Sequence, residues 1–277
     1  MPSPAITVRG QQQDWAQQRS ISIDSAGYTR SLDDNLFVPL SPETLAEFTD
    51  GDGSELGKLG ERGKMQALHS SSALACNVFE YWRGRDAWPL AQALSVDEGI
   101  ASIGFERKFP TGLQGNAPNL DVILVAPSGR VTTIECKFLE PYGSHDARFK
   151  SKYFETEPGL WQAAGFSDCQ ALAQRLYSGE FQYRWLNAEQ LLKHILGLHK
   201  GPHKQWALLY LWYEIPGAAG GEHAAEAESF ASVASGDGID FRATSYQSVF
   251  RALEASASQS DHEYLAYLGE RYFGKSD

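Results

Sequence analysis

Cysteine, basic residues and long apolar runs are all scarce in this chain of 277 residues, and each shortage excludes a class of protein. The three cysteines form no CxxC pair, which argues against a disulfide framework or a structural zinc site and is typical of a reducing compartment. Uninterrupted apolar runs are far shorter than the roughly 20 residues of a membrane-spanning helix, and the N-terminus lacks a basic-then-apolar signal pattern. We therefore expect a cytoplasmic protein that does not enter a membrane.

Basic residues are outnumbered, because 24 Lys and Arg stand against 35 Asp and Glu, for a net charge of −11. This balance is unfavourable for nucleic-acid binding, which depends on Lys and Arg contacts to phosphates. The basic residues are unevenly spread, however: residues 190–213 contain no Asp or Glu but carry Lys193, Lys200 and Lys204. The overall charge therefore does not exclude a nucleic-acid partner that meets a local basic surface.

Residues 119–138 are predicted to form a β-hairpin. Two runs of β-branched and aliphatic residues flank Pro127-Ser128-Gly129, in which proline presets the first loop position and Gly129 can take a left-handed conformation. This is the chemistry of a three-residue loop closed by a bulge. Such a loop pairs Ala126 with Arg130.

The predicted register brings three charged side chains to one face at the open end of the hairpin. Counting outward puts Asp121 opposite Glu135, and the alternation of strand side chains puts Lys137 on the same face. Two like charges buried close together are unfavourable unless a cation neutralises them, and oxygen ligands suit Mg²⁺ or Mn²⁺. The alternative is a salt-bridged Asp–Glu–Lys cluster at a sheet edge. A four-residue loop would shift the register and separate Asp121 from the other two.

Asp121 followed by Glu135-Cys136-Lys137 on the next strand resembles the D…(D/E)-x-K signature of the PD-(D/E)XK nuclease superfamily. Pro118 lies three residues before Asp121 instead of beside it, so the first half of the motif is degenerate. Three stretches, in this order, also resemble one group of uncharacterised bacterial members: residues 70–79, the Glu135-Cys136-Lys137-Phe138 box, and Gln190–His194 followed by an apolar strand. The resemblance covers roughly residues 60–275.

The resemblance implies a restriction-endonuclease-like core and a metal-dependent nuclease that hydrolyses phosphodiester bonds of DNA, with RNA as the other candidate substrate. In the proposed geometry, Asp121 and Glu135 hold Mg²⁺ or Mn²⁺ together with the backbone carbonyl of Cys136. Lys137 orients or deprotonates the attacking water and stabilises charge that develops on the phosphate. The alternative is a catalytically silent nuclease-like module that binds nucleic acid or protein.

Two further site residues are implied by position within the resembled fold. Glu80 lies on the predicted helix that precedes the core sheet, where such proteins often supply another acid to the metal site. Gln190 lies on the helix after the motif strand, near the place of the scissile phosphate. The alternative for Glu80 is a solvated residue on an amphipathic helix.

Residues 148–154 alternate basic and aromatic side chains, which suits contacts to a nucleic-acid backbone combined with base stacking, although solvated loops show the same pattern. These residues are Arg148, Phe149, Lys150, Lys152, Tyr153 and Phe154. Three histidines at 194, 199 and 203 do not share one helical face across Gly201-Pro202, so we do not expect zinc.

The chain is predicted to fold as an α/β domain whose mixed central sheet is flanked by helices. Residues 1–60 are polar and predict an N-terminal arm or cover with little regular structure, and residues 61–277 form the nuclease-like domain. Residues 216–238 are rich in Gly, Ala, Ser and Glu and predict a flexible insertion. The sequence leaves the oligomeric state open, a homodimer being one option. Strands are predicted near residues 100, 121, 131, 206 and 239.

Overall fold

A five-stranded mixed sheet is the centre of the computed structural model, which describes residues 4–51, 55–58, 61–143 and 148–274. The strands lie in chain order; β1, β2 and β3 are antiparallel, and β4 and β5 run parallel to β3. The predicted α/β fold with a mixed sheet is therefore confirmed. The strands are β1 (Ser102–Lys108), β2 (Asn119–Val125), β3 (Val131–Lys137), β4 (Trp206–Trp212) and β5 (Phe241–Ser245).

The β2–β3 turn has the predicted chemistry. The N–H of Ala126 donates to the carbonyl of Arg130 at 2.9 Å, and the N–H of Gly129 donates back to the carbonyl of Ala126 at 2.9 Å. Gly129 has a φ of 87°, the left-handed value that a side chain would strain. A three-residue loop therefore joins the strands, which fixes their register.

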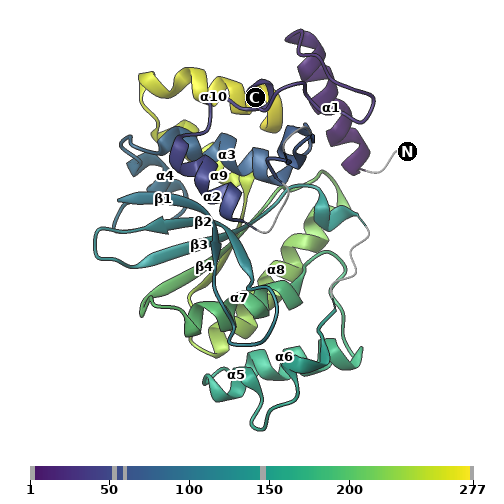
Figure 1. Ribbon diagram of the computed structural model, residues 1–277, viewed down its shortest axis with the longest axis vertical. Helices are drawn as coiled ribbons and strands as arrows, with labels where there is room; N and C mark the ends of the chain where they lie inside the picture. Colours follow the sequence, from purple (N-terminus) through teal and green to yellow (C-terminus); the bar gives the residue numbers. More distant parts are fainter. Residues whose placement is uncertain (1–3, 52–54, 59–60, 144–147, 275–277) are drawn as a thin grey trace.

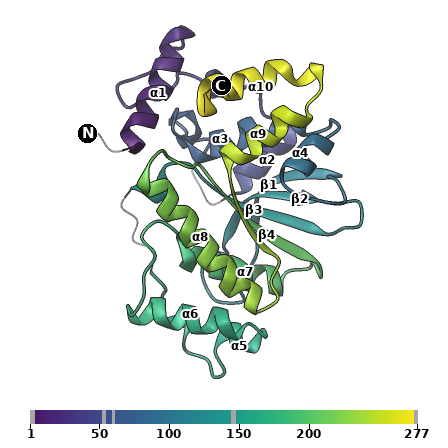
Figure 2. The same cartoon turned by 180° about the vertical axis from the view of Figure 1, so that it is seen from behind.

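Helices cover both faces of the sheet (Figures 1 and 2). One face packs in a hydrophobic core with α3, α9 and α10, and the other with α7 and α8, against which α6 packs. The helices are α1 (Pro4–Gln18), α2 (Pro42–Asp50), α3 (Ser71–Phe79), α4 (Trp88–Ala93), α5 (Leu160–Ala163), α6 (Ser167–Ser178), α7 (Ala188–Lys200), α8 (Ala218–Gly236), α9 (Tyr246–Ser256) and α10 (His262–Leu268). None of the helices in the described part of the chain has the length and apolarity to cross a membrane.

Short helical turns complete the fold. In the described ranges, six of these turns are 3-10 helices, and the last is a π-helical turn that continues α10. They are η1 (Asp33–Asn35), η2 (Lys64–Gln66), η3 (Glu80–Trp82), η4 (Glu140–Tyr142), η5 (Ser151–Tyr153), η6 (Gln259–Asp261) and η7 (Gly269–Phe273).

The prediction that residues 1–60 contain little regular structure is wrong, because this segment holds α1 and α2. Trp15 of α1 and Phe48 of α2 are buried in the same hydrophobic core as one face of the sheet. The sequence carries a start signal for α2, since the Ser41 side chain accepts a backbone N–H and Pro42 occupies the first turn. The polar composition of the segment does not indicate these helices, because each of them buries only a narrow face and exposes the rest to solvent.

The prediction of a flexible insertion at residues 216–238 is also wrong. These residues form α8, which buries Phe230, His223 and Ala227 and packs on β5 and α6. Small residues are common in loops, but they also allow close packing in a helix. A Cβ on Gly220 would lie 2.1 Å from the carbonyl oxygen of Ile215. Gly220 thus lets the first turn of α8 lie against the backbone of the segment that leads into it.

A buried arginine in η7 joins the C-terminal part of the chain to α1, which lies beside it in Figures 1 and 2. Arg271 is 3% exposed; its Nε donates to Gln12 Oε1 at 3.1 Å and its Nη1 donates to the Asn35 carbonyl at 2.8 Å. The Arg271 guanidinium carbon also lies 4.4 Å from the centroid of the Trp15 ring. Neutral oxygens and aromatic rings thus hold this cation, and the guanidinium fork binds several of them at once.

We predict that Arg271→Ala lowers the free energy of unfolding by roughly 3 kcal/mol, because the buried acceptors on Gln12 and Asn35 lose their donor. Urea unfolding followed by circular dichroism measures this change. The control is Arg251→Ala on the exposed side of α9, for which we expect a change within about 0.5 kcal/mol. Equal effects of the two substitutions would contradict the proposed role of Arg271.

Candidate active site

Asp121, Glu135 and Lys137 meet on the face of the sheet that α7 covers, at the end of the hairpin away from its turn. Val122 pairs with Ile134, so the same count puts Asp121 opposite Glu135. Alternation along β3 keeps Lys137 on their face. The structure therefore brings the three motif side chains together as the sequence predicts.

The β2–β3 ladder opens at the motif. Regular pairing ends at Val122 and Ile134, and the next hydrogen-bonded pair in register would be Leu120 and Cys136. The N–H of Cys136 donates instead to Asp121 Oδ2 at 2.6 Å. Because the N–H and C=O of a strand residue point to the same edge, the Cys136 carbonyl also faces this opening. The aspartate side chain thus takes the place of a ladder bond.

Glu135 is 1% exposed, and its two carboxylate oxygens face two different basic groups. Lys137 Nζ forms an ion pair with Oε1, and His194 Nε2 lies 2.9 Å from Oε2. His194 is itself buried and comes from α7, whose start is capped by the Asn187 side chain accepting the N–H of Gln190 at 3.0 Å. The sequence predicts that His194 lies on this helix, but it does not predict the contact with Glu135. That contact depends on how α7 is rotated about its axis where it packs on β3.

These contacts push the pKa values of the two acids in opposite directions. Burial would raise the pKa of Glu135, but the charges of Lys137 and His194 outweigh it and lower the pKa to about 2. Burial and then the charge of Glu135 raise the pKa of Asp121 well above its ordinary value. Burial would lower the pKa of Lys137, but the charges of Glu135 and Asp121 raise it. The site therefore favours a carboxylate, a protonated carboxyl and an ammonium.

Glu106 is a third acid at this site that the sequence analysis missed. Phe105 pairs with Val122 in the β1–β2 register, which places Glu106 opposite Asp121. Glu106 has a φ of 51°, a left-handed value rarely adopted by a residue with a side chain. Its carboxylate accepts a hydrogen bond from the side chain of Asn119. A strained backbone thus holds a further carboxyl beside the motif.

Glu80, predicted as a metal ligand, has other partners. It is buried, and its carboxylate accepts hydrogen bonds from the N–H of Ser41 at 2.8 Å and from Thr44 Oγ1 at 2.8 Å. Arg83 Nε lies 3.6 Å from the same carboxylate. Glu80 therefore anchors the start of α2, and these contacts do not support the predicted metal-binding role.

Gln190 lies one helical turn before His194 on α7. Its Oε1 accepts a hydrogen bond from Asn187 Nδ2 at 3.3 Å, next to the helix cap. Its place near a scissile phosphate stays a prediction. The α7 side chain that reaches the motif is His194.

The donor set fits a divalent cation chemically, although no three His, Cys, Asp or Glu side chains in the described residues are arranged as a ready metal site. Asp121, Glu135 and the Cys136 carbonyl offer oxygen only, which suits Mg²⁺ or Mn²⁺. Among the described residues, the buried Glu135 Oε2 accepts no directed hydrogen bond, because the His194 ring approaches it out of line. A buried carboxylate oxygen with a free lone pair is a place where a cation would be stabilised.

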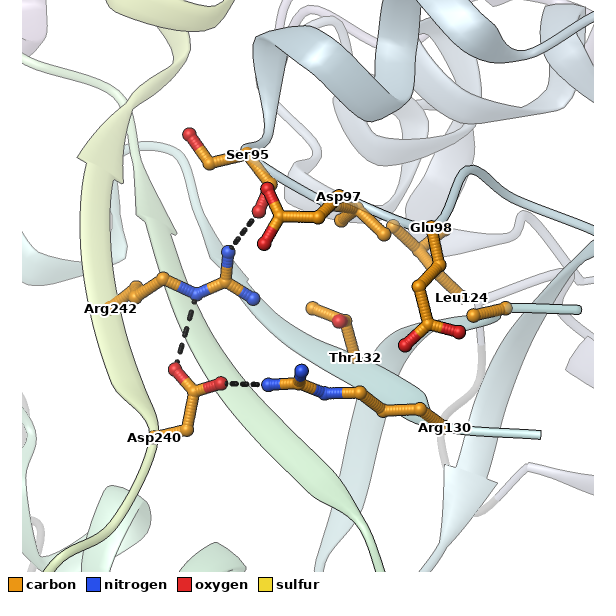
Figure 3. Close-up of a pocket in the computed structure, with 10 residues that line it drawn as sticks. Ser95, Asp97, Glu98, Leu124, Arg130, Thr132, Asp240 and Arg242 are labelled. Carbon is orange, nitrogen blue, oxygen red and sulfur yellow. Dashed lines mark hydrogen bonds and ion pairs between the residues drawn. The ribbon is translucent and has the colours of Figure 1, made fainter. Parts of the chain in front are cut away.

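A cavity of about 310 Å³ lies at the opposite end of the sheet, by the hairpin turn (Figure 3). Asp240 there forms an ion pair with Arg130, and Arg242 Nε lies 3.4 Å from Asp240. Arg242 also donates to the carbonyl of Ser95 at 2.5 Å. Asp240 is thus shared between two arginines, and the cavity lies away from the residues of the D…ExK motif.

The mixed sheet, its covering helices and the D…ExK residues at the open hairpin define a restriction-endonuclease-like protein. A family model described as "Restriction Endonuclease associating with ARP" matches residues 9–273. The chain belongs to this family, and the resemblance to the PD-(D/E)XK superfamily is confirmed. No curated protein and no solved structure matches the chain significantly.

The raised pKa of Glu106 makes the stability of the protein depend on pH. Burial, then the charges of Glu55 and Glu135, raise the pKa of Glu106 from 4.5 to about 7. The contribution of Glu106 to stability is thus full below pH 4.5 and is lost as the pH rises through about 7. We expect Glu106→Gln to be more stable than wild type at about pH 8, by on the order of 2 kcal/mol after allowance for partial exposure, and this gain to vanish towards about pH 5.

Urea unfolding across this pH range measures the difference, with Glu43→Gln on the exposed side of α2 as the control. The control should show no such trend, since Glu43 is exposed and folding does not move its carboxyl out of water. A gain for Glu106→Gln that is independent of pH would contradict the placement of Glu106 among buried acids.

Proposed function

We propose that the protein is a divalent-metal-dependent deoxyribonuclease whose centre consists of Asp121, Glu135 and Lys137. The convergence of two carboxyl groups and one ammonium at the opened hairpin carries this proposal. Membership in a restriction endonuclease family supports DNA as the substrate. The cofactor is Mg²⁺ or Mn²⁺, because the ligands are hard oxygen donors.

Asp121, Glu135 and the carbonyl of Cys136 would hold the cation. A bound divalent ion supplies Lewis acidity and lowers the pKa of a coordinated water. Lys137 remains protonated because its two acidic neighbours raise its pKa. Its role is therefore to stabilise negative charge that develops on the phosphate, and not to deprotonate water. His194 positions Glu135 from the far side of the carboxylate.

A binding module without turnover is the second candidate. The observation that favours it is the lack, among the described residues, of a preformed group of three metal-ligating side chains. Titration with Mn²⁺ followed by electron paramagnetic resonance, together with cleavage assays on several DNA forms, separates the two. Cation binding without cleavage of any form would identify the module.

We predict that Asp121→Asn and Lys137→Gln each reduce Mg²⁺-dependent cleavage of plasmid DNA at least about 100-fold, because each removes a charge used in the transition state. Gel electrophoresis of the products measures this loss. Both variants keep the size of the replaced side chain, and circular dichroism checks that they remain folded.

Asp240→Asn is the matched control, because it removes a carboxylate at the other end of the same sheet (Figure 3). It should cleave at a rate within about threefold of wild type. Unchanged cleavage by folded Asp121→Asn would remove our assignment of the centre. A loss in all three variants would point to a general effect on the fold.

A further inference from the structure

We propose that Lys150, Lys152 and Lys193 form a binding track for the phosphates of duplex DNA beside the motif site. We call these three residues the lysine cluster. The inference extends the proposed function by naming how the substrate is held. It depends on contacts distinct from those of Asp121, Glu135 and Lys137, and it can be tested without cleavage.

The lysine cluster is assembled from two segments that are far apart in sequence. Lys193 comes from α7, and its Nζ lies 5.2 Å from the ring centroid of Phe149 and 5.7 Å from that of Tyr153. Lys152 Nζ lies 5.6 Å from the same Tyr153 ring. These aromatic faces attract the ammonium groups and hold them on the surface of the loop.

The rings of Phe149 and Tyr153 are buried, at 7% and 6% exposure. The expectation that they stack on bases is therefore wrong, because a base cannot reach them. They pack instead in the core with Trp161 below α7. Phe154, the third aromatic residue of the stretch, is half-buried and stacks on Tyr177, with ring centroids 4.2 Å apart. Beside Lys193 the rings of Phe149 and Tyr153 therefore hold the ammonium groups and offer no face to a base.

The three ammonium groups are close enough to act on one another. Burial lowers the pKa of Lys193, and the charges of Lys150 and Lys152 lower it further, against the charge of Glu189 on the same helix. Glu189, one helical turn before Lys193, balances part of this positive charge, whereas Lys152 Nζ is bound by a neutral group, the carbonyl of Gln114. Three ammonium groups this close repel one another, and a bound anion would relieve that repulsion.

The lysine cluster lies at the motif end of the sheet. Lys193 directly precedes His194, whose ring reaches Glu135. Lys152 Nζ donates to the carbonyl of Gln114, in the connection between β1 and β2 that leads to Asp121. A second lysine holds the same connection, because Lys200 Nζ donates to the carbonyl of Thr111 at 2.7 Å.

The backbone of this connection comes unusually close to the lysines. Gly115 has a φ of 103°, and a Cβ there would lie 3.2 Å from Lys152 Nζ. Gly112 has a φ of 80°, and a Cβ there would lie 3.0 Å from Lys200 Nζ. The left-handed φ values favour glycine at both positions, and the absence of a side chain leaves room for the two ammonium groups beside this connection.

This chemistry fits a phosphate backbone. Ammonium groups are compact point charges that bind phosphates without reading bases, and the rings next to them, Phe149 and Tyr153, are buried. We therefore expect binding that depends little on sequence and strongly on salt. On duplex DNA each phosphate contact contributes about 0.9 to the slope of log K against log salt concentration.

The test compares two triple variants with the same net charge. The first carries Lys150→Gln, Lys152→Gln and Lys193→Gln; the second replaces three exposed basic residues elsewhere, Arg9→Gln, Arg30→Gln and Lys58→Gln. Each variant removes three positive charges from the same chain, so the overall charge of the two is equal. Fluorescence anisotropy measures binding to a short blunt DNA duplex in EDTA, between about 50 and 200 mM salt.

The slope of log K against log salt concentration should be smaller in the first variant than in wild type by up to about 2.7, or about 0.9 for each lysine. Raising the salt from about 50 to 200 mM should therefore weaken DNA binding about 40-fold less in this variant than in wild type. The second variant should keep the wild-type slope. The single variant Lys150→Gln, at an exposed side chain, guards against misfolding of the triple variant and should lose about 0.9.

Equal slopes for the two triple variants, or no binding of the duplex by wild type at low salt, would overturn the inference. The result is independent of the proposed catalysis. If the salt slope falls in the first triple variant but wild type cleaves no DNA, the lysine cluster is supported and the proposed nuclease activity is contradicted. If wild type cleaves DNA but the first triple variant keeps the wild-type salt slope, only the proposal of the lysine cluster is contradicted.

Discussion

The negative charge of Glu135 is the constraint on which the rest of the site depends. A carboxylate with 1% exposure costs several kcal/mol unless nearby groups compensate for it. Lys137 comes from the same strand and His194 from the helix packed on it, so the compensation is part of how α7 lies on β3. Burial and the charge of Glu135 disfavour a second negative charge on Asp121 more than Lys137 and the N–H of Cys136 stabilise it, so its carboxyl favours the proton. A divalent cation would supply the missing charge, and this links the unusual state of Asp121 to metal binding.

The sequence predicts what local chemistry decides. The turn at Gly129 sets the β2–β3 register, and that register alone brings Asp121 and Glu135 opposite each other. The start of α7 is equally local, because Asn187 caps it from the preceding position. For these elements a few adjacent residues determine the geometry, and the packing of the rest of the chain follows from them.

Features that depend on distant partners were not predicted. Glu106 reaches the site only through the β1–β2 register, which is set across a ten-residue connection and a left-handed residue that no turn motif announces. Glu80 resembles a site acid in the sequence, but its carboxylate accepts hydrogen bonds from the N–H of Ser41 and the hydroxyl of Thr44. These two partners lie nearly forty residues away in the sequence, so no local pattern indicates them. α8 was mistaken for a loop because small residues have the same composition in a mobile segment and at a close helix contact.

The charge of −11 and an affinity for phosphates are compatible because of where the charges lie. Within the motif site Glu135 is balanced by Lys137, so this centre gives little net attraction for a polyanion. Screening limits exposed charges to about 8–10 Å at physiological salt, so acids elsewhere on the surface have little effect there. Attraction for a phosphate backbone must therefore come from basic groups next to the site. Lys150, Lys152 and Lys193 are such groups in the described residues. If the motif site is the catalytic centre we propose, a phosphate backbone would be held by this positive flank and cleaved at the motif beside it.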